Sequence, residues 1–150
     1  MIHHLPRRVV TGLDAQGRSA VIIDGPVAPV SAFGGIAWHA PGAVADNSGT
    51  DDAAPAEFSF DLMHAGTTFM HHTYVPGHGE FWHATNTVEY IVMLEGEVVL
   101  MLESGEVTLR EGDFAVDRGV NHCWRNDSGR PARAAIVSIP AHPVGKGRTV

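Results

Sequence analysis

Two histidines and one glutamate stand at spacings that can place their side chains on common faces of short strands. His83 and Thr85 lie two residues apart, so they share a face, and Glu89 can join them after a short turn. His122 and Trp124 share a face in the same way on a later segment. Two imidazoles and one carboxylate form the facial set that binds Fe²⁺ and also suits Mn²⁺, Ni²⁺, Co²⁺ or Zn²⁺. The pattern therefore predicts a divalent metal held by His83, Glu89 and His122, with open positions for water and substrate.

The elements that must position these ligands are short strands. Seventeen Gly and nine Pro separate short runs of Val, Ile, Phe and Thr, which is typical of a sandwich or barrel. Consecutive antiparallel strands with short connections would close into a compact barrel. The expected strands cover residues 58–62, 67–75, 81–85, 89–94, 98–102, 107–110, 114–116, 122–125 and 134–139.

The length of 150 residues fits a single domain with one core. Residues 1–56 are expected to be an N-terminal arm and loop that pack on the barrel, residues 57–143 the barrel, and residues 144–150 a C-terminal tail. Within the first part, strand-like segments at 8–11 and 20–23 flank a turn-rich stretch, and the segment at 40–55 has the composition of an exposed loop.

Composition narrows the classes of function. Hydrophobic residues make up 44% and charged residues 18%, which is enough apolar surface for a core. A net charge of -7 without a basic run argues against nucleic acid and anionic membranes as partners, and favours a small-molecule substrate. The first ten residues lack a signal-peptide pattern and no stretch is long enough to span a membrane, so a cytoplasmic protein is expected. The single cysteine, Cys123, excludes an internal disulfide.

Two segments resemble the paired motifs of the cupin superfamily. Gly77, His83, Thr85, Glu89 and Gly96 match the first motif, G-x5-H-x-H-x3-4-E-x6-G, at every signature position except Thr85. The resemblance implies an all-β fold, a single-domain cupin β-barrel of the RmlC-like jelly-roll type, here with an N-terminal strand arm.

The second motif, G-x5-P-x-G-x2-H-x3-N, resembles the segment that contains Gly112, Gly119, His122 and Asn126. The stretch before Gly119 is one residue short and the proline is absent. The segments 86–90, 117–126 and 7–12 are similar to a group of small bacterial and fungal cupins that generally has a threonine at the position of Thr85.

Cupins that bind metal typically supply three histidines and one glutamate, so Thr85 replaces one expected ligand. Three outcomes follow: a three-ligand site completed by water, a fourth ligand recruited from His64, His71, His72 or His78, or loss of the metal. A neutral hydroxyl is a poor ligand for these ions, so Thr85 is assigned to hydrogen bonding with substrate or metal-bound water.

Several further residues are predicted to line the site. Thr85 and His72 are the candidates for handling protons, although only one of His71 and His72 can point inward because they are adjacent on a strand. The expected pocket walls are Trp124, Met93, Phe69 and His71.

A Lewis-acidic metal in an apolar pocket predicts an enzyme that acts on a small oxygenated molecule, including aromatic or polyketide-like ones. Lyase chemistry such as decarboxylation or dehydration is the leading interpretation. An Fe²⁺ dioxygenase that uses the same triad is one alternative, and a non-catalytic small-molecule-binding protein is another. A homodimer is expected, because exposed sheet edges need covering and the N-terminal arm can pair with a neighbouring subunit.

Overall fold

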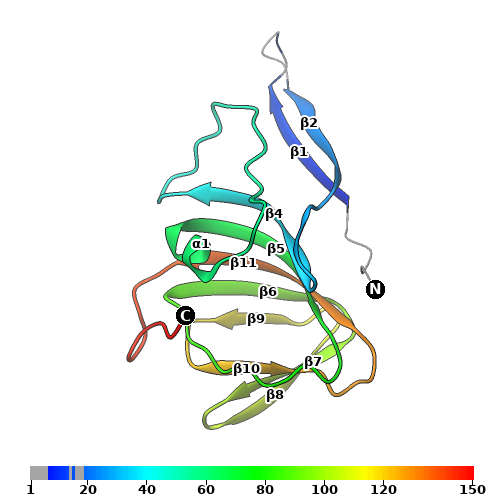
Figure 1. The fold of residues 1–150 in the computed structure, drawn as a ribbon, viewed down its shortest axis with the longest axis vertical. Coiled ribbons are helices and arrows are strands. Elements are labelled where there is room, and N and C mark those ends of the chain that lie inside the picture. The colour runs from blue at the N-terminus through cyan, green and yellow to red at the C-terminus, as the bar shows by residue number, and fades with distance from the viewer. Residues whose placement is uncertain (1–6, 14, 16–18) are drawn as a thin grey trace.

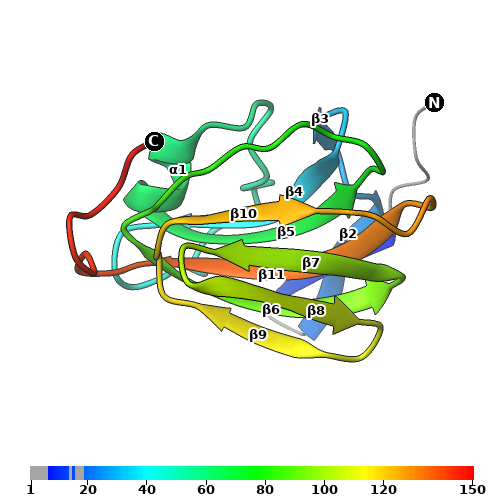
Figure 2. The same ribbon diagram turned by 90° about the horizontal axis from the view of Figure 1, so that it is seen from below.

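A computed structural model describes residues 7–13, 15 and 19–150, and its architecture is built almost entirely from antiparallel strands (Figure 1). A six-stranded sheet has the order β3-β4-β5-β11-β6-β9, and a three-stranded sheet has the order β10-β7-β8. Figure 2 shows β10, β7 and β8 lying across from the larger sheet. The strands of the larger sheet are β3 (Pro29–Ser31), β4 (Gly34–Pro41), β5 (Gly66–Tyr74), β6 (Thr87–Glu95), β9 (Phe114–Asp117) and β11 (Ala132–Pro140), and those of the smaller sheet are β7 (Glu97–Leu102), β8 (Gly105–Arg110) and β10 (His122–Arg125).

The core forms where the two sheets face each other. Burial along β11 alternates strictly, since Ala132, Ala134, Ile136 and Ser138 are buried while the residues between them are partly exposed. This period of two is what a strand with one face on the core requires. The prediction of an all-β cupin fold is confirmed.

The N-terminal segment forms a separate hairpin of β1 (Arg7–Leu13) and β2 (Ser19–Pro26), paired antiparallel. The strands predicted at 8–11 and 20–23 lie within it, whereas most of the predicted turn at 14–17 falls outside the described residues. In Figure 1 the hairpin stands clear of the two facing sheets.

Two expected strands are different in the structure. Residues 60–65 form the short helix α1 (Phe60–Ala65), because the Ser59 hydroxyl accepts a hydrogen bond from the Leu62 amide and Asp61 occupies the first turn. Residues 81–85 make only an isolated bridge between His83 and His122. The apolar residues of both segments fit a helix or an irregular wall as well as a strand.

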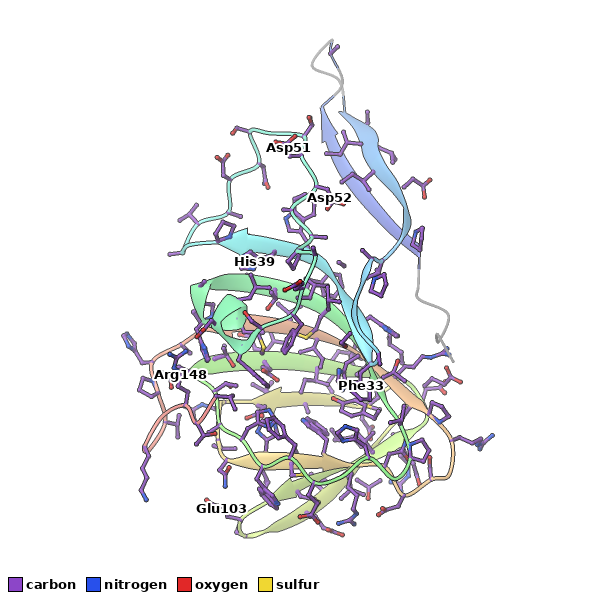
Figure 3. All side chains as sticks on the ribbon, in the orientation of Figure 1. Phe33, His39, Asp51, Asp52, Glu103 and Arg148 are labelled. Carbon is purple, nitrogen blue, oxygen red and sulfur yellow. The ribbon has the colours of Figure 1, made fainter. Side chains whose placement is uncertain are left out.

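Part of the segment predicted as N-terminal arm and loop lies within the larger sheet. β4 pairs with β5 from Gly34↔His72 to Pro41↔Gly66, so residues 29–41 belong to the larger sheet. The loop predicted from residue 40 begins after Pro41 and carries Asp51 and Asp52 away from the sheet (Figure 3). Among the described residues, no helix is long and apolar enough to cross a membrane.

Candidate functional site

A cavity of about 380 Å³ is lined by residues of both sheets, of α1 and of the segment that follows β5. Its size lies within the range of about 300–1,000 Å³ typical of small-molecule sites. Six of the lining residues are Phe, Tyr or Trp, and Phe33, labelled in Figure 3, lies at the turn between β3 and β4. The walls include Phe33, Phe58, Phe60, Phe81 and Trp124. His83, Glu89 and His122 all line it, so the structure brings the three predicted metal ligands to one cavity.

His83 and His122 are held side by side by their backbones. Each amide donates to the carbonyl of the other residue at 3.0 Å, and the two ring centroids lie 4.4 Å apart. The Nδ1 atom of His83 lies 3.1 Å from the Phe81 carbonyl, and Nδ1 of His122 lies 2.8 Å from the Val120 carbonyl. Because a carbonyl only accepts, each Nδ1 carries the proton, which leaves both Nε2 atoms available. Nε2 of His122 is buried without any hydrogen-bond partner in the described protein.

Asp117 was not singled out from the sequence, yet it is the closest charged neighbour of His122. Its Oδ2 lies 2.9 Å from His122 Nδ1, and both side chains are almost fully buried. Its Oδ1 accepts a hydrogen bond from the Gly119 amide at 2.9 Å. Burial alone would lower the pKa of His122, but the ion pair with Asp117 outweighs it and the pKa is raised. Asp117 therefore fixes both the position and the proton of this imidazole.

Glu89 is a second buried carboxyl group, directly opposite Asp117 in the register of β6 and β9. Burial raises its pKa to about 7, and the negative charge of Asp117 contributes in the same direction. Thr87, two residues earlier on the same face, donates to Glu89 Oε1 over 3.5 Å. This end of the cavity therefore contains two carboxyl groups, and His122 is paired with one of them. The single imidazole cannot balance the negative charge of both carboxylates.

Thr85 is bound to this network rather than exposed to the cavity. Its hydroxyl shares a hydrogen bond of 2.7 Å with the hydroxyl of Thr87, and only 1% of the residue is exposed. Thr85 is not among the residues that line the cavity. The structure therefore gives it an indirect position, behind Thr87 and Glu89, instead of the predicted place beside substrate.

Gly119 brings the loop before β10 against the Thr85 segment. Its φ of +73° suits glycine, and a Cβ at this position would lie 2.2 Å from the Thr85 carbonyl oxygen. The absence of a side chain at this position of the second motif thus allows the loop that carries Asp117 and His122 to approach the segment that carries Thr85 and Thr87.

The residue types and the hydrogen bonds of this group fit a metal site, whereas the positions of the side chains do not form a coordination shell. Among the residues that the structure describes, no set of three or more His, Cys, Asp or Glu side chains is arranged at metal-ligand spacing. The unpaired Nε2 of His122 and the carbonyl-bound Nδ1 atoms of both histidines nevertheless match the usual state of metal-binding imidazoles, whose second nitrogen donates to a carboxylate or carbonyl. A divalent cation would also balance the charges of Glu89 and Asp117.

Strand alternation determines which of the remaining predicted site residues point into the cavity and which point away from it. His72 shares the inward face of β5 with Tyr74, at 4.5 Å between ring centroids, and lines the cavity. His71 borders the cavity, but the alternation directs its side chain outward, and burial and the charge of Arg133 lower its pKa. Of the four histidines considered as a fourth ligand, His78 also lines the cavity, whereas His64 accepts a hydrogen bond from the Asn86 amide and contacts Arg148.

The structure places the three residues predicted as aromatic and apolar walls in different surroundings. Trp124 lines the cavity and lies 5.8 Å from the His122 ring. Phe69 points to the opposite side of β5 and is 48% exposed, because it lies an odd number of residues from His72. Met93 faces inward but is packed in the core, with 1% of the residue exposed, and does not line the cavity.

Tyr74 is a cavity residue that the sequence analysis missed. It packs between His72 and Trp124, and its hydroxyl is buried without a hydrogen-bond partner in the described part of the chain. Burial raises the pKa of this phenol, and the charges of Glu89 and Asp117 raise it further, so the hydroxyl keeps its proton. Its position on the inward face of β5, two residues after His72, was the available signal.

Comparison with known proteins agrees with the fold and the motifs. Residues 70–139 match the cupin domain family, and this part of the chain is a cupin domain of the cupin superfamily. The oryzines biosynthesis cluster protein J of Aspergillus oryzae is 44% identical over 85 residues, which cover 55% of this chain and 48% of that protein. A cupin-domain-containing oxidoreductase of Hypocrea virens is 35% identical over 66 residues, covering 41% of this chain and 34% of that protein. The chain thus spans half or less of the length of these curated relatives.

Solved structures that are similar to about half of this chain include two bacterial proteins. The cupin domain of an XRE family transcriptional regulator from Enterobacter cloacae has a TM-score of 0.43 at 22% identity, covering 52% of this chain and 83% of that chain. The TT1209 protein from Thermus thermophilus has a TM-score of 0.43 at 27% identity, covering 50% of this chain and 73% of that chain.

Proposed function

We propose that this protein is an enzyme that binds a small oxygenated molecule in the aromatic cavity and acts on it with a divalent transition metal held by His83, Glu89 and His122. The favoured reaction is of the lyase type, a decarboxylation or dehydration. The observation that carries the proposal is the buried group at one end of the cavity, in which two carboxyl groups lie beside an imidazole whose Nε2 has no partner among the described residues.

Charge balance supports a cation at this position. Glu89 and Asp117 are 7% and 4% exposed, and burying a carboxylate without a counter-charge costs several kcal/mol. Among the described residues that line the cavity there is no Lys or Arg. When bound, a divalent metal would polarise a carbonyl or carboxylate oxygen of the substrate and stabilise negative charge on it.

Side chains of the protein supply the remaining functions. The aromatic walls exclude water from the substrate and favour an aromatic or otherwise flat apolar body. The Tyr74 hydroxyl, protonated and unpaired within the described structure, can donate a hydrogen bond or a proton to a substrate oxygen. Burial lowers the pKa of His72 to about 4, so its imidazole is neutral near pH 7 and acts as a hydrogen-bonding group rather than as a cation.

A second candidate is an oxidoreductase, with Fe²⁺ on the same three residues. It is favoured by relatives from Hypocrea virens and Neurospora crassa that are named as cupin-domain-containing oxidoreductases. The names of relatives from the oryzines and phomopsin biosynthesis clusters support small-molecule biosynthesis under either candidate.

Turnover under argon distinguishes the two reactions. The protein, loaded in turn with Fe²⁺, Mn²⁺, Ni²⁺, Co²⁺ or Zn²⁺, would be tested against a panel of aromatic β-keto acids and β-hydroxy ketones, with mass spectrometry and oxygen consumption as readouts. We expect loss of CO₂ or water at the same rate in argon and in air, with Glu89→Gln as the inactive control. Turnover only in air, with oxygen consumed, would replace the lyase by the oxygenase, and tight binding of panel compounds without turnover would leave a binding protein.

A further inference from the structure

We propose that Thr149 and Arg148 are positioning residues for the cavity, because they fasten the segment that carries His83 to the helix α1. They belong to residues 141–150, which are called the C-terminal strap below. The strap, red in Figure 1, turns back after β11 ends at Pro140, and in both Figure 1 and Figure 2 it lies close to α1. Its effect on a bound metal rests on the proposed function, whereas its effect on the cavity walls does not.

The two elements that the strap joins both form walls of the cavity. Phe60 of α1 and His83 line it, and their ring centroids lie 5.5 Å apart. The ring of Phe81 lies 6.1 Å from that of Phe60 and 4.9 Å from that of His83. Phe58 and Phe81 are exposed as well as lining the cavity, so this part of the wall borders solvent. The position of α1 relative to residues 81–86 therefore sets the shape of the cavity beside His83.

The segment that carries His83 lies outside the regular strands, so it depends on contacts from distant parts of the chain. The backbone of His83 pairs with that of His122. The next residue, Ala84, is buried, and its backbone pairs with Thr149. The Ala84 amide donates to the Thr149 hydroxyl at 2.9 Å, and the Thr149 amide donates to the Ala84 carbonyl at 2.9 Å. Because a buried amide that loses its acceptor is destabilising, the Thr149 hydroxyl holds this segment in place.

Asn86 is the residue at which the strap and α1 meet. Its amide donates to Nε2 of His64 on α1 at 3.1 Å, and its carbonyl accepts from the Ala141 amide at 2.9 Å. Its side-chain oxygen accepts from the Arg148 amide at 2.9 Å. Gly147 has a φ of +80°, and a Cβ there would lie 3.2 Å from this oxygen, so glycine suits the turn that brings the strap past Asn86. The strap is thus bound to the end of the His83 segment as well as to its middle.

The side chain of Arg148, labelled in Figure 3, connects the strap to α1. Its Nη1 lies 3.0 Å from Oδ1 of Asp61 and 2.8 Å from Nδ1 of His64. The guanidinium and the Asn86 amide only donate, so a charged imidazole with two N–H groups would oppose both, whereas a neutral ring accepts from one of them in each tautomer. Burial and the charge of Arg148 lower the pKa of His64, although Asp61 acts in the opposite direction, so the ring is neutral at pH 7. The Arg148–Asp61 ion pair is largely exposed and contributes little, so Thr149 is expected to have the larger effect.

Hydrogen exchange of the metal-free protein, followed by mass spectrometry in EDTA, tests the strap without reference to a metal. Thr149→Val keeps the shape of the side chain but removes the hydroxyl that accepts from the Ala84 amide. We expect exchange in residues 58–65 and 83–86 to become about 10-fold faster, because both walls lose an anchor, while the rest of the chain is unchanged. Thr149→Ser keeps the hydroxyl and should restore the wild-type rates. Thr108→Val, a matched change at a partly exposed threonine of β8, should leave both segments unchanged.

Isothermal titration with Co²⁺ reports whether the strap positions His83. We expect Thr149→Val to bind Co²⁺ about 10-fold more weakly, the lower end of the range for groups that orient metal-binding side chains. Arg148→Gln should have a smaller effect, and Thr149→Ser and Lys146→Gln should bind as the wild type does. Unchanged exchange in Thr149→Val would overturn the proposal, and so would equal acceleration in Thr149→Ser, or wild-type Co²⁺ affinity despite faster exchange. The expected exchange pattern in a wild type that binds no Co²⁺ would support the strap and reject the metal of the proposed function.

Discussion

Replacing Glu89 with glutamine is expected to stabilise the metal-free protein at pH 8 while it abolishes metal binding. Burial raises the pKa of Glu89 from 4.5 to about 7. A carboxyl group whose pKa is raised on folding contributes stability that is complete below pH 4.5 and is lost as the pH rises through 7. At pH 8 the wild type therefore carries a buried charge that glutamine lacks, and each unit of pKa shift corresponds to about 1.4 kcal/mol.

Urea unfolding in the presence of EDTA measures this effect. The free energy of unfolding of Glu89→Gln relative to wild type is expected to rise between about pH 5 and pH 8, by at most about 3 kcal/mol. His72, whose pKa is lowered on folding, makes an opposite contribution to the pH dependence. This contribution cancels because it is present in both the wild type and Glu89→Gln. Glu111→Gln, an exposed residue, removes the same charge and should show no such rise. A pH-independent difference for Glu89→Gln would contradict a carboxyl group whose pKa is raised by burial.

Replacing Asp117 with asparagine is expected to weaken metal binding by about 10- to 100-fold, as is usual for groups that hold a metal-binding imidazole. Asparagine can still accept the hydrogen bond from the Gly119 amide, so the turn is kept. What is lost is the negative charge 2.9 Å from His122 Nδ1, which strengthens Nε2 as a ligand.

Isothermal titration with Co²⁺ or Zn²⁺ against a competing chelator measures the change. Asp113→Asn is the matched control, since Asp113 also accepts a backbone amide hydrogen bond, from Arg110, but lies exposed at a turn outside the cavity. Equal affinities of the Asp117 and Asp113 variants would show that Asp117 does not act on the metal site.

Much of the arrangement follows from strand alternation, which can be read from the sequence. It predicts that Tyr90 points away from Glu89, and the structure places Tyr90 on the outward side of the larger sheet and Glu89 in the cavity. The same alternation left His71 and His72 unresolved, because adjacent residues exchange faces when the register shifts by one. Pairing of β5 with β4 and β11 settles the register and turns His72 inward.

Other features depend on contacts that no local pattern specifies. The apolar residues Phe60, Leu62 and Met63 are compatible with a helix as well as with a strand. The N-cap hydrogen bond of Ser59 favours the helix α1. The second cupin motif has a proline two residues before its last glycine, and Asp117 occupies that place before Gly119. The missing proline was visible, but the ion pair with His122 depends on how the loop folds back after β9.

The metal content of the purified protein beside a His122→Ala variant tests the central claim most directly. We expect about one equivalent of a transition metal in the wild type after reconstitution and none in the variant, with an unchanged circular dichroism spectrum. His39→Ala, at a partly buried histidine of β4 that does not line the cavity, should keep the metal. A wild-type protein that binds no metal after incubation with each of the five ions, or a His122→Ala variant that binds as much as wild type, would contradict the proposed site.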